Sequence, residues 1–511
     1  MSSWSEGYVT EVGYTFGYYR ELNPLRMRLA FIEAGLAVPY IKNACELGFG
    51  QGVSVNIHAA AGDAAWYGTD FNPAQAGFAR ELAQSAGSGA ALFDDSFAEF
   101  AKRDDLPQFD FIGMHGTWSW IDDENRAVLV DFIRRRLAIG GVLYVSYNTL
   151  PGWAPMIPVR ELLLAHSEAL GARGQGIVSR VEGAFSFLEQ LLSVNPNFSR
   201  VVPGLGKAIG DTKPLSRQYL AHEYFNRSWS PMAFNRMAEW LSSAKLDYAC
   251  SAYFPDFVDP INLTQPQQQL LAEIADPGFR QLVRDFIVNQ QFRRDYWIRG
   301  ARPLSPMERV EALRAHRVML IQPRADVPLK YAGGVLGEVD LQEAIYGPLL
   351  DLLADHRARS IGEIERAMSG RCALAHIVQA VFLLEAAERI CSVQDDAAIA
   401  RATAGTRALN EALCRKARDG ESTLILASPV SGGGIAVGRV EAVLLQACWA
   451  GGKTVEDWVG FALHRVLDGG LGLVKEGRIL EGEEENRAAL REHAKILSEK
   501  KLPIYRALGL I

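Results

Sequence analysis

Short apolar runs alternate with amphipathic stretches along the first 150 residues of the chain. Most of the runs are followed by Gly, Asp or Asn, which is typical of buried strands, and the stretches between them carry apolar residues at helical spacing. This alternation of strand and helix predicts an α/β protein with a doubly wound parallel sheet, covered by helices on both faces. The expected strands lie at 43–47, 65–70, 90–93, 109–114 and 141–147.

The first expected strand ends in Glu46 and is followed by a turn with three glycines, Gly48, Gly50 and Gly52. Glycine has no Cβ, so such a turn lets the backbone lie against a ligand, and the helix expected at 53–61 would add unpaired N–H groups. The dinucleotide fingerprint G-x-G-x-x-G would need glycine at position 53, which is Val. The run E-x-G-x-G-x-G instead resembles motif I of class I S-adenosyl-L-methionine (SAM) methyltransferases.

Acidic residues follow the next two expected strands. Asp70 lies about 20 residues beyond the glycine turn, where a carboxylate can accept hydrogen bonds from ribose hydroxyls, although a lone Asp here could also cap a helix. Asp95 with Ser96 is the candidate contact for the adenine amino group, and Asp94 is an alternative. The competing interpretation is that an Asp caps the helix expected at 97–102.

Three strings make the resemblance specific: Tyr14-Thr15-Phe16-Gly17-Tyr18-Tyr19-Arg20-Glu21-Leu22-Asn23-Pro24, His115-Gly116-x-x-Ser119-Trp120 and Tyr147-Asn148-x-x-Pro151-Gly152-Trp153. With them the chain resembles bacterial methyltransferases that carry a methyltransferase regulatory domain, best known from the rickettsial-type protein-lysine methyltransferases. The resemblance implies SAM as cofactor and S-adenosyl-L-homocysteine (AdoHcy) as product. It also implies a homodimer and a protein substrate, for example an outer-membrane or surface protein before its export.

Methyl transfer is an in-line displacement at a sulfonium carbon, so the protein mainly positions two reactants and excludes water, and no metal is needed. A lysine acceptor must first lose a proton, which costs about 4.6 kcal/mol at pH 7 from a pKa near 10.4. A dry aromatic channel would lower that pKa. Aromatic residues near the ends of the fourth and fifth strands are candidates for this channel, although each could equally be a core residue: Trp118, Trp120, Tyr147 and Trp153.

Polar residues beside these aromatics complete the candidate site. His115 and Gly116 follow the fourth strand, where His115 could contact the methionine part of SAM or the acceptor, or could simply brace the loop. Asn148 could present a carbonyl oxygen to an amine or occupy a turn. The tyrosine-rich N-terminal segment could fold over the cofactor as a lid or form a helix packed on the sheet; its tyrosines are Tyr14, Tyr18 and Tyr19.

The expected architecture is a Rossmann-like class I methyltransferase sheet with a helical insertion, followed by smaller domains. Such a sheet needs a further helix and two more strands, which the sequence places at 232–244, 247–254 and 295–298. Alternatively, the sheet ends at five strands and residues 215–300 fold separately. The expected parts are a SAM-binding domain at 1–154, an insertion for dimerisation or lid closure at 155–229, the completion of the sheet at 230–303, a winged-helix-like domain at 304–397 and an α/β C-terminal domain at 398–511.

The winged-helix-like order of elements raises nucleic-acid binding as a rival function. Helices expected at 343–355, 361–368 and 375–388 precede a short strand at 390–393. The third helix would enter the major groove, but it contains no Lys or Arg. This favours a protein-docking or structural role.

Composition and charge indicate which partners and which compartment to expect for the protein. The net charge of −7 argues against nucleic acid or an anionic membrane as the main partner. No signal peptide is visible, no apolar run approaches the roughly 20 residues of a membrane span, and the six cysteines form no C-x-x-C pair, so we expect a cytoplasmic protein without disulfides. Two other functions stay open: methylation of a small molecule or peptide natural product, and a catalytically silent SAM-binding regulator.

Overall fold

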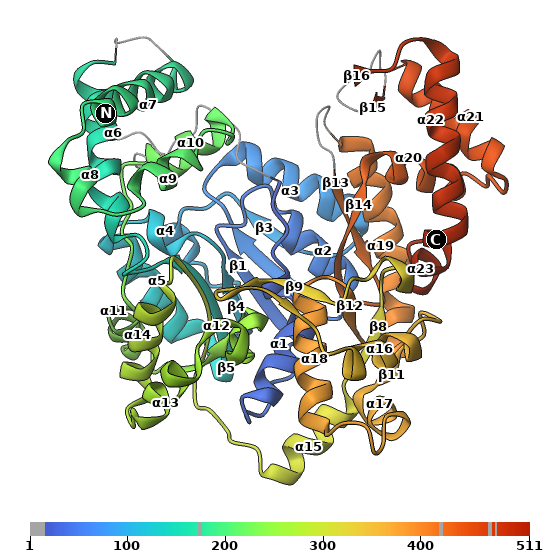
Figure 1. Ribbon diagram of the computed structural model, residues 1–511, viewed down its shortest axis with the longest axis horizontal. Helices are drawn as coiled ribbons and strands as arrows, with labels where there is room; N and C mark the ends of the chain where they lie inside the picture. The colour runs from blue at the N-terminus through green and yellow to red at the C-terminus, as the bar shows by residue number, and fades with distance from the viewer. Residues whose placement is uncertain (1–15, 172–175, 418–422, 469–472, 476–477) are drawn as a thin grey trace.

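The computed structural model describes residues 16–171, 176–417, 423–468, 473–475 and 478–511. At its centre is a seven-stranded sheet of order β3-β2-β1-β4-β5-β7-β6 (Figure 1). The first five strands are parallel, and β7 runs antiparallel to both β5 and β6. The strands are β1 (Asn43–Leu47), β2 (Ala65–Thr69), β3 (Ala91–Phe93), β4 (Phe109–Met114), β5 (Leu137–Asn148), β6 (Asp247–Ser251) and β7 (Phe292–Ile298).

The prediction of a doubly wound sheet that is completed after an insertion is confirmed. β5 pairs with β7 from Val142 opposite Ile298 to Asn148 opposite Phe292, so the alternative of a five-stranded sheet with a separate domain is wrong. β5 begins at Leu137, earlier than expected. The reason is that Gly140, with a φ of 80°, lets the strand continue through a bend.

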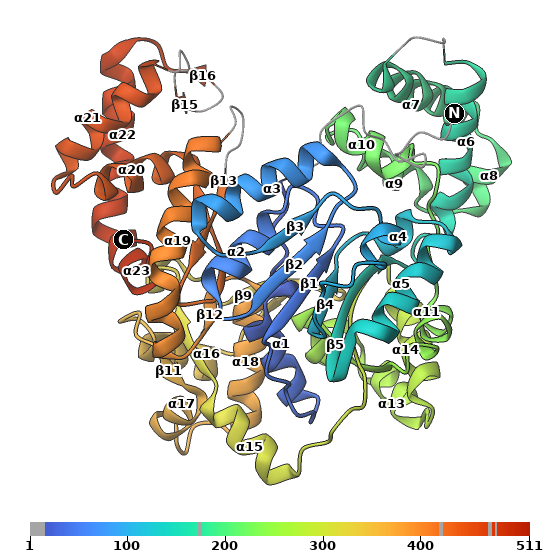
Figure 2. The same ribbon diagram turned by 180° about the vertical axis from the view of Figure 1, so that it is seen from behind.

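Helices cover both faces of the sheet (Figure 2). Successive residues of a strand point to opposite faces, so Phe111 joins the core under the first group of helices and Ile112 the core under the second. The first group is α1 (Pro24–Glu33), α2 (Val53–Ala61) and α3 (Pro73–Ala86), and the second is α4 (Phe97–Phe100), α5 (Asp123–Arg136) and α11 (Phe234–Ser242). α1 begins at an Asn-Pro pair, and the Asn23 side chain caps it by accepting a hydrogen bond from the Leu25 N–H.

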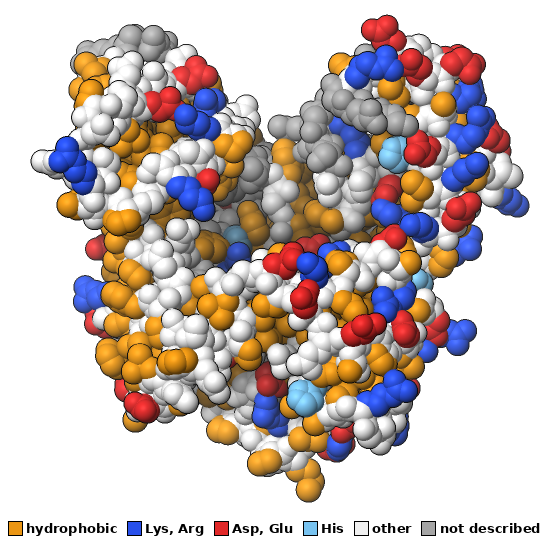
Figure 3. All heavy atoms as spheres, in the orientation of Figure 1, with side chains coloured by type: hydrophobic (Ala, Val, Ile, Leu, Met, Phe, Trp, Pro, Cys, Tyr) orange, Lys and Arg blue, Asp and Glu red, His pale blue; other side chains and the backbone are white. Residues whose placement is uncertain are grey.

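The insertion between β5 and α11 is helical and has its own apolar core, to which Leu163, Val181 and Leu220 belong. It forms one of two lobes on either side of a hollow, and the C-terminal helices form the other (Figures 1 and 3). The helices of the insertion are α6 (Ile157–Ala169), α7 (Ile177–Ser193), α8 (Asn197–Val201), α9 (Leu205–Gly210) and α10 (Arg217–Tyr224). Between β6 and β7 lie α12 (Asp259–Asn262), α13 (Gln265–Glu273) and α14 (Pro277–Val288).

The middle domain packs directly on the methyltransferase sheet. The ring of Phe382 packs on two rings of the segment after β6: its centroid lies 4.7 Å from that of Phe254 and 4.6 Å from that of Phe257. The third helix of the winged-helix order, α18 (Leu374–Ala386), is therefore covered, which supports the structural interpretation over groove binding. The other elements are α15 (Pro306–Ala315), β8 (Arg317–Leu320), β9 (Lys330–Gly334), β10 (Gly337–Asp340), α16 (Glu343–Leu352), β11 (Arg359–Ser360), α17 (Ile361–Ala367) and β12 (Ile390–Val393).

The C-terminal domain covers the outer side of α2 and α3. Leu409 and Ala427 of this domain share a buried apolar cluster with Ile57 and Leu82. Its elements are α19 (Asp396–Lys416), β13 (Thr423–Ser428), β14 (Gly433–Gly438), α20 (Arg439–Trp449), α21 (Val455–Asp468), β15 (Val474–Lys475), β16 (Arg478–Ile479), α22 (Gly482–Ile496) and α23 (Leu502–Ala507). Among the described helices, none has the length and apolar character that crossing a bilayer requires.

Candidate functional site

The glycine turn joins β1 to α2, as predicted. Gly48, Gly50 and Gly52 have φ values of 71°, 58° and 69°, a region that residues with a side chain rarely adopt. A Cβ at Gly48 would lie 2.6 Å from Thr117 Oγ1, and a Cβ at Gly52 would lie 2.4 Å from the Ala79 Cβ. The turn therefore requires glycine, and it leaves bare backbone at the carboxyl edge of the sheet, where ligands of open α/β sheets bind.

Two buried carboxylates lie beside this turn. Asp70 follows β2 and accepts hydrogen bonds from the N–H groups of Gly50 (2.8 Å) and Asn72 (3.1 Å). The helix cap is Asn72, so capping is not the role of Asp70. Burial raises the pKa of Asp70 to about 6, and burial together with the charge of Asp70 raises the pKa of Glu46 well above its ordinary value. Glu46 Oε2 is buried and has no hydrogen-bond partner among the described residues, so it can accept a hydrogen bond from a ligand.

The residues after β3 divide between surface and capping roles. Ser96 is the N-cap of α4 and forms a capping box with Glu99, in which its hydroxyl donates to the Glu99 carboxylate and accepts from the Glu99 N–H. A contact between Ser96 and adenine stays a prediction. Asp94 is exposed and pairs with Arg80 at 2.7 Å. Asp95 is half-buried and pairs with Arg103 at 3.1 Å. A contact between Asp95 and adenine stays a prediction.

Two neighbouring tyrosines of the N-terminal segment point in opposite directions, because side chains alternate in extended backbone. Tyr19 stacks on His115, with ring centroids 3.6 Å apart, and its N–H donates to Ser54 Oγ at 2.8 Å. The Tyr18 hydroxyl lies 3.3 Å from His58 Nε2, toward the C-terminal end of α2 and the hairpin of β13 and β14. This corrects the prediction that Tyr18 faces the candidate site; the tyrosine of this segment that packs on His115 is Tyr19. Tyr14 lies outside the described residues.

A polar cluster surrounds His115 at the end of β4. His115 Nδ1 lies 2.8 Å from the Tyr144 hydroxyl, and the guanidinium of Arg294 lies 3.6 Å from Glu21 Oε1. Burial lowers the pKa of His115 to about 4, so the ring is uncharged at pH 7. Although Glu21 is buried, the positive charge of Arg294 holds the pKa of its carboxyl below the usual value. The cluster therefore presents a carboxylate, a guanidinium and a neutral imidazole together.

Gly116 fixes the path of the chain after His115. It has a φ of 63° and donates its N–H to Ser146 Oγ at 2.8 Å, which ties the end of β4 to β5. A hydrogen bond from the Gly116 backbone to a cofactor stays a prediction.

The four aromatic residues predicted to line an acceptor channel fall into two groups. Trp118 and Tyr147 are completely buried in the core under α5 and α11, which corrects the prediction that they line an acceptor channel. The Tyr147 hydroxyl donates to Asp295 at 2.9 Å and so belongs to the attachment of β7 to β5. Trp120 and Trp153, in contrast, are half-buried and both pack on Trp229, with centroid distances of 6.3 Å and 5.4 Å.

Asn148 is the last residue of β5 and is almost fully buried. Its backbone N–H donates to Ser119 Oγ at 2.8 Å, and its backbone carbonyl accepts from the Met232 N–H at 2.9 Å. Asn148 therefore lies inside the sheet rather than in a turn. An acceptor role for its amide stays a prediction.

Sequence reasoning missed Glu21, Tyr144 and Arg294 as site residues. Glu21 lies inside the first motif string, and Arg294 lies within β7. No spacing rule connects them, because they meet only when β7 pairs with β5 and the Tyr296 hydroxyl donates to the Glu21 carbonyl at 2.6 Å.

Comparison with known proteins finds a matching family model and related bacterial proteins. The model of the predicted methyltransferase regulatory domain matches residues 216–299. The protein sll1526 of Synechocystis is 38% identical over 514 residues, which cover 99% of this chain and all of that protein. RP789 of Rickettsia prowazekii is 24% identical over 55% of this chain and 51% of its own length.

The solved structure of PKMT2 from Rickettsia typhi in complex with AdoHcy superimposes with a TM-score of 0.70 at 16% identity, over 97% of this chain and 99% of PKMT2. This agreement shows that the two chains share one fold from end to end. The chain therefore belongs to the family of the Synechocystis protein sll1526, with a class I SAM-dependent methyltransferase fold and a methyltransferase regulatory domain.

Proposed function

We propose that the chain is a SAM-dependent methyltransferase that methylates a lysine side chain of a protein. The observation that carries this proposal is the juxtaposition of two half-sites at the carboxyl edge of the sheet. One is the glycine turn with Glu46 and Asp70, and the other is the cluster around His115. Thr117, two residues beyond His115, lies against Gly48 and so connects the half-sites.

The first half-site fits SAM. Asp70 would accept hydrogen bonds from the vicinal hydroxyls of the ribose. Glu46 Oε2, which has no partner in the part of the chain that the structure describes, would accept one from the ammonium of the methionine part. The bare glycine backbone and the N-terminus of α2 would face the same ligand. When bound, SAM supplies an electrophilic methyl group on a sulfonium.

The second half-site suits an amine acceptor. The Glu21 carboxylate is the group that would bind a lysine ammonium as it enters. The positive charge of Arg294, 3.6 Å from Glu21, and the burial of the site both disfavour the charged amine, so they promote loss of its proton to solvent. Tyr19, stacked on His115, covers the site and limits the access of water.

The surroundings support a large acceptor. The insertion lobe and the C-terminal lobe flank a hollow in the molecular surface (Figure 3). The resemblance to protein-lysine methyltransferases suggests that the substrate is an outer-membrane or surface protein, methylated in the cytoplasm before export. Exposed apolar side chains on the insertion, Leu170, Val194 and Val201, lead us to infer that this lobe also contacts a second copy in a homodimer.

The test uses SAM with an isotopically labelled methyl group and an extract of the cells that make the protein. Mass spectrometry should find the label on lysine in one or a few proteins, and Asp70→Ala should abolish the labelling. Label on a small molecule or peptide would support the natural-product alternative. AdoHcy binding without any labelled product would indicate a silent regulator, and either result would contradict the proposal.

A further inference from the structure

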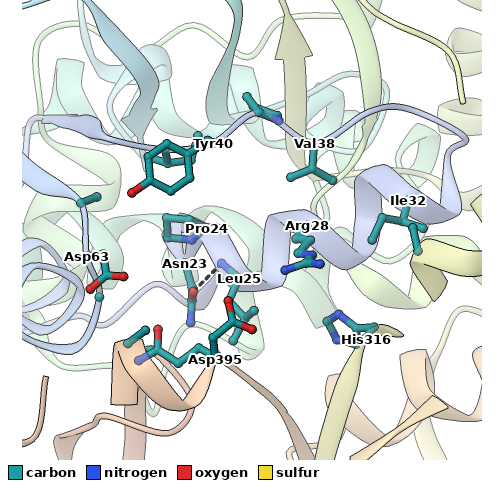
Figure 4. A pocket seen from close by; sticks show the side chains of 18 of the residues that line it. Asn23, Pro24, Leu25, Arg28, Ile32, Val38, Tyr40, Asp63, His316 and Asp395 are labelled. Atoms are coloured by element: carbon teal, nitrogen blue, oxygen red, sulfur yellow. Dashed lines mark hydrogen bonds between the residues drawn. The ribbon is translucent and has the colours of Figure 1, made fainter. Parts of the chain in front are cut away.

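A cleft of about 490 Å³ lies between α1, the segment at 37–41, and the middle and C-terminal domains (Figure 4). Ile41, two residues before β1, and Ala64, directly before β2, are among its lining residues. The cleft is therefore at the amino edge of the sheet, on the opposite side from the glycine turn. It is distinct from the site proposed for SAM.

Arg28 of α1 extends into this cleft between Val38 and His316 (Figure 4). Arg28 is half-buried, and it has no hydrogen-bond or ion-pair partner within the part of the chain that the structure describes. Arg317, which also lines the cleft, is held by Asp396 at 2.9 Å. A guanidinium carries five N–H donors, and leaving them unpaired in a partly desolvated position is costly.

The other groups that face Arg28 do not neutralise it. His316 is buried, and its Nε2 lies 2.9 Å from Ser392 Oγ; burial and the charge of Arg28 both lower its pKa, so the ring carries no charge at pH 7. Asp63 forms an ion pair with Arg401, and Asp395 is exposed at the start of α19. Since Arg302, at the cleft, also has no ion-pair partner among the described residues, unpaired positive charge exceeds unpaired negative charge there.

The remaining walls are apolar. Ile32, Val38 and Ala312 line the cleft, Trp66 contributes an almost fully buried indole, and the ring of Tyr40 is 78% exposed. An exposed aromatic ring beside apolar walls suits a flat apolar ligand, and a cleft of this volume is within the ordinary range for small-molecule sites.

We propose that this cleft binds a small amphipathic anion, whose acidic group pairs with Arg28 and whose flat apolar body lies against Val38 and Tyr40. The ligand would contact α1, the segment that leads into β1, and the middle and C-terminal domains together. The proposal goes beyond methyl transfer and does not depend on it. Calorimetry with AdoHcy tests the cofactor site, and the following experiment tests only the cleft.

The probe is 1-anilinonaphthalene-8-sulfonate, an aromatic sulfonate whose fluorescence rises in apolar surroundings. The full chain is titrated with excess AdoHcy present, so that the carboxyl edge does not contribute to the signal. Arg28→Gln removes the proposed anchor, and Ala315→Trp fills the cleft from an exposed position at the end of α15. Arg236→Gln removes an exposed arginine of α11 as the matched control. Thermal unfolding confirms that each variant is folded.

We expect saturable binding of one probe molecule to the wild type and to Arg236→Gln. Arg28→Gln should weaken binding at least tenfold because it removes the charged donor, and Ala315→Trp should do so because the indole occupies the cleft. Displacement of the probe by 2-naphthoate or by naphthyl phosphate would support the proposal and identify the acidic group. Absence of saturable binding, or wild-type affinity in both cleft variants, would overturn it.

Discussion

The affinity for AdoHcy should fall as the pH is lowered through about 6, because Asp70 must be ionised to accept two ribose hydroxyls. In the ligand-free protein, burial raises the pKa of Asp70 to about 6, although the N–H groups of Gly50 and Asn72 partly oppose this effect. Hydroxyl donors stabilise the ionised carboxylate. Ligand binding therefore lowers the pKa of Asp70, and protonation of the free protein competes with binding.

The size of the effect follows from this pKa. About nine tenths of Asp70 is ionised at pH 7 and about one tenth at pH 5, so the affinity should fall roughly tenfold between these values, or about 1.4 kcal/mol. Most of the loss should occur below pH 6, and Asp70 should contribute little change above pH 7. Glu46, whose pKa is also raised, can add to the slope.

Isothermal titration calorimetry from pH 5 to pH 8 measures this dependence. Asp70→Asn keeps the size of the side chain and one acceptor oxygen, so it should bind AdoHcy more weakly at pH 7 and should lose the part of the slope that belongs to Asp70. A wild-type affinity that is the same at pH 5 and pH 7 would refute the reasoning. An unchanged slope in Asp70→Asn would show that another group titrates.

Three further changes test other parts of the structure. Glu21→Gln removes the carboxylate beside Arg294, so methyl transfer to the identified acceptor should slow roughly 10- to 100-fold. The calorimetric affinity for AdoHcy should stay within about twofold. A loss of AdoHcy affinity instead would place Glu21 in the cofactor site. Asn410→Ala leaves the buried N–H and C=O of Ala427 without their partner, which should lower the free energy of unfolding by about 2–4 kcal/mol. The control Thr403→Ala, on the exposed side of the same helix, should lower it by less than about 1 kcal/mol. Equal denaturation midpoints for these two variants would contradict the packing described for α19. Val201→Glu places a charge on an exposed apolar position of the insertion and should lower the mass measured by light scattering from dimer to monomer, and an unchanged dimer would exclude this surface.

Local patterns explain why the sheet and the cofactor half-site could be predicted. The turn after β1 needs three glycines for its positive φ values, and Asp70 follows the next strand at a fixed interval, so both signals lie within about 25 residues. The extent of α2 was also predictable. All nine of its residues are buried, because the C-terminal domain, far away in the sequence, covers its outer side.

The acceptor half-site depends on contacts between distant segments. Whether Tyr18 or Tyr19 faces the site is set by the phase of an extended segment, and Ser54 fixes that phase through the Tyr19 N–H. Trp118 and Tyr147 are core residues because α11 and β7 cover them. Both covering elements come from beyond the insertion, so sequence near the strand ends could not distinguish a core aromatic from a channel aromatic.

The central claim is that the glycine turn and Asp70 bind the sugar end of SAM, and calorimetric titration of the purified chain with AdoHcy at pH 7.5 tests it most directly. We predict saturable binding of one AdoHcy per chain, weakened at least tenfold by Asp70→Ala in a protein that unfolds with a normal cooperative transition. No detectable heat with the wild type, or wild-type affinity in Asp70→Ala, would contradict it.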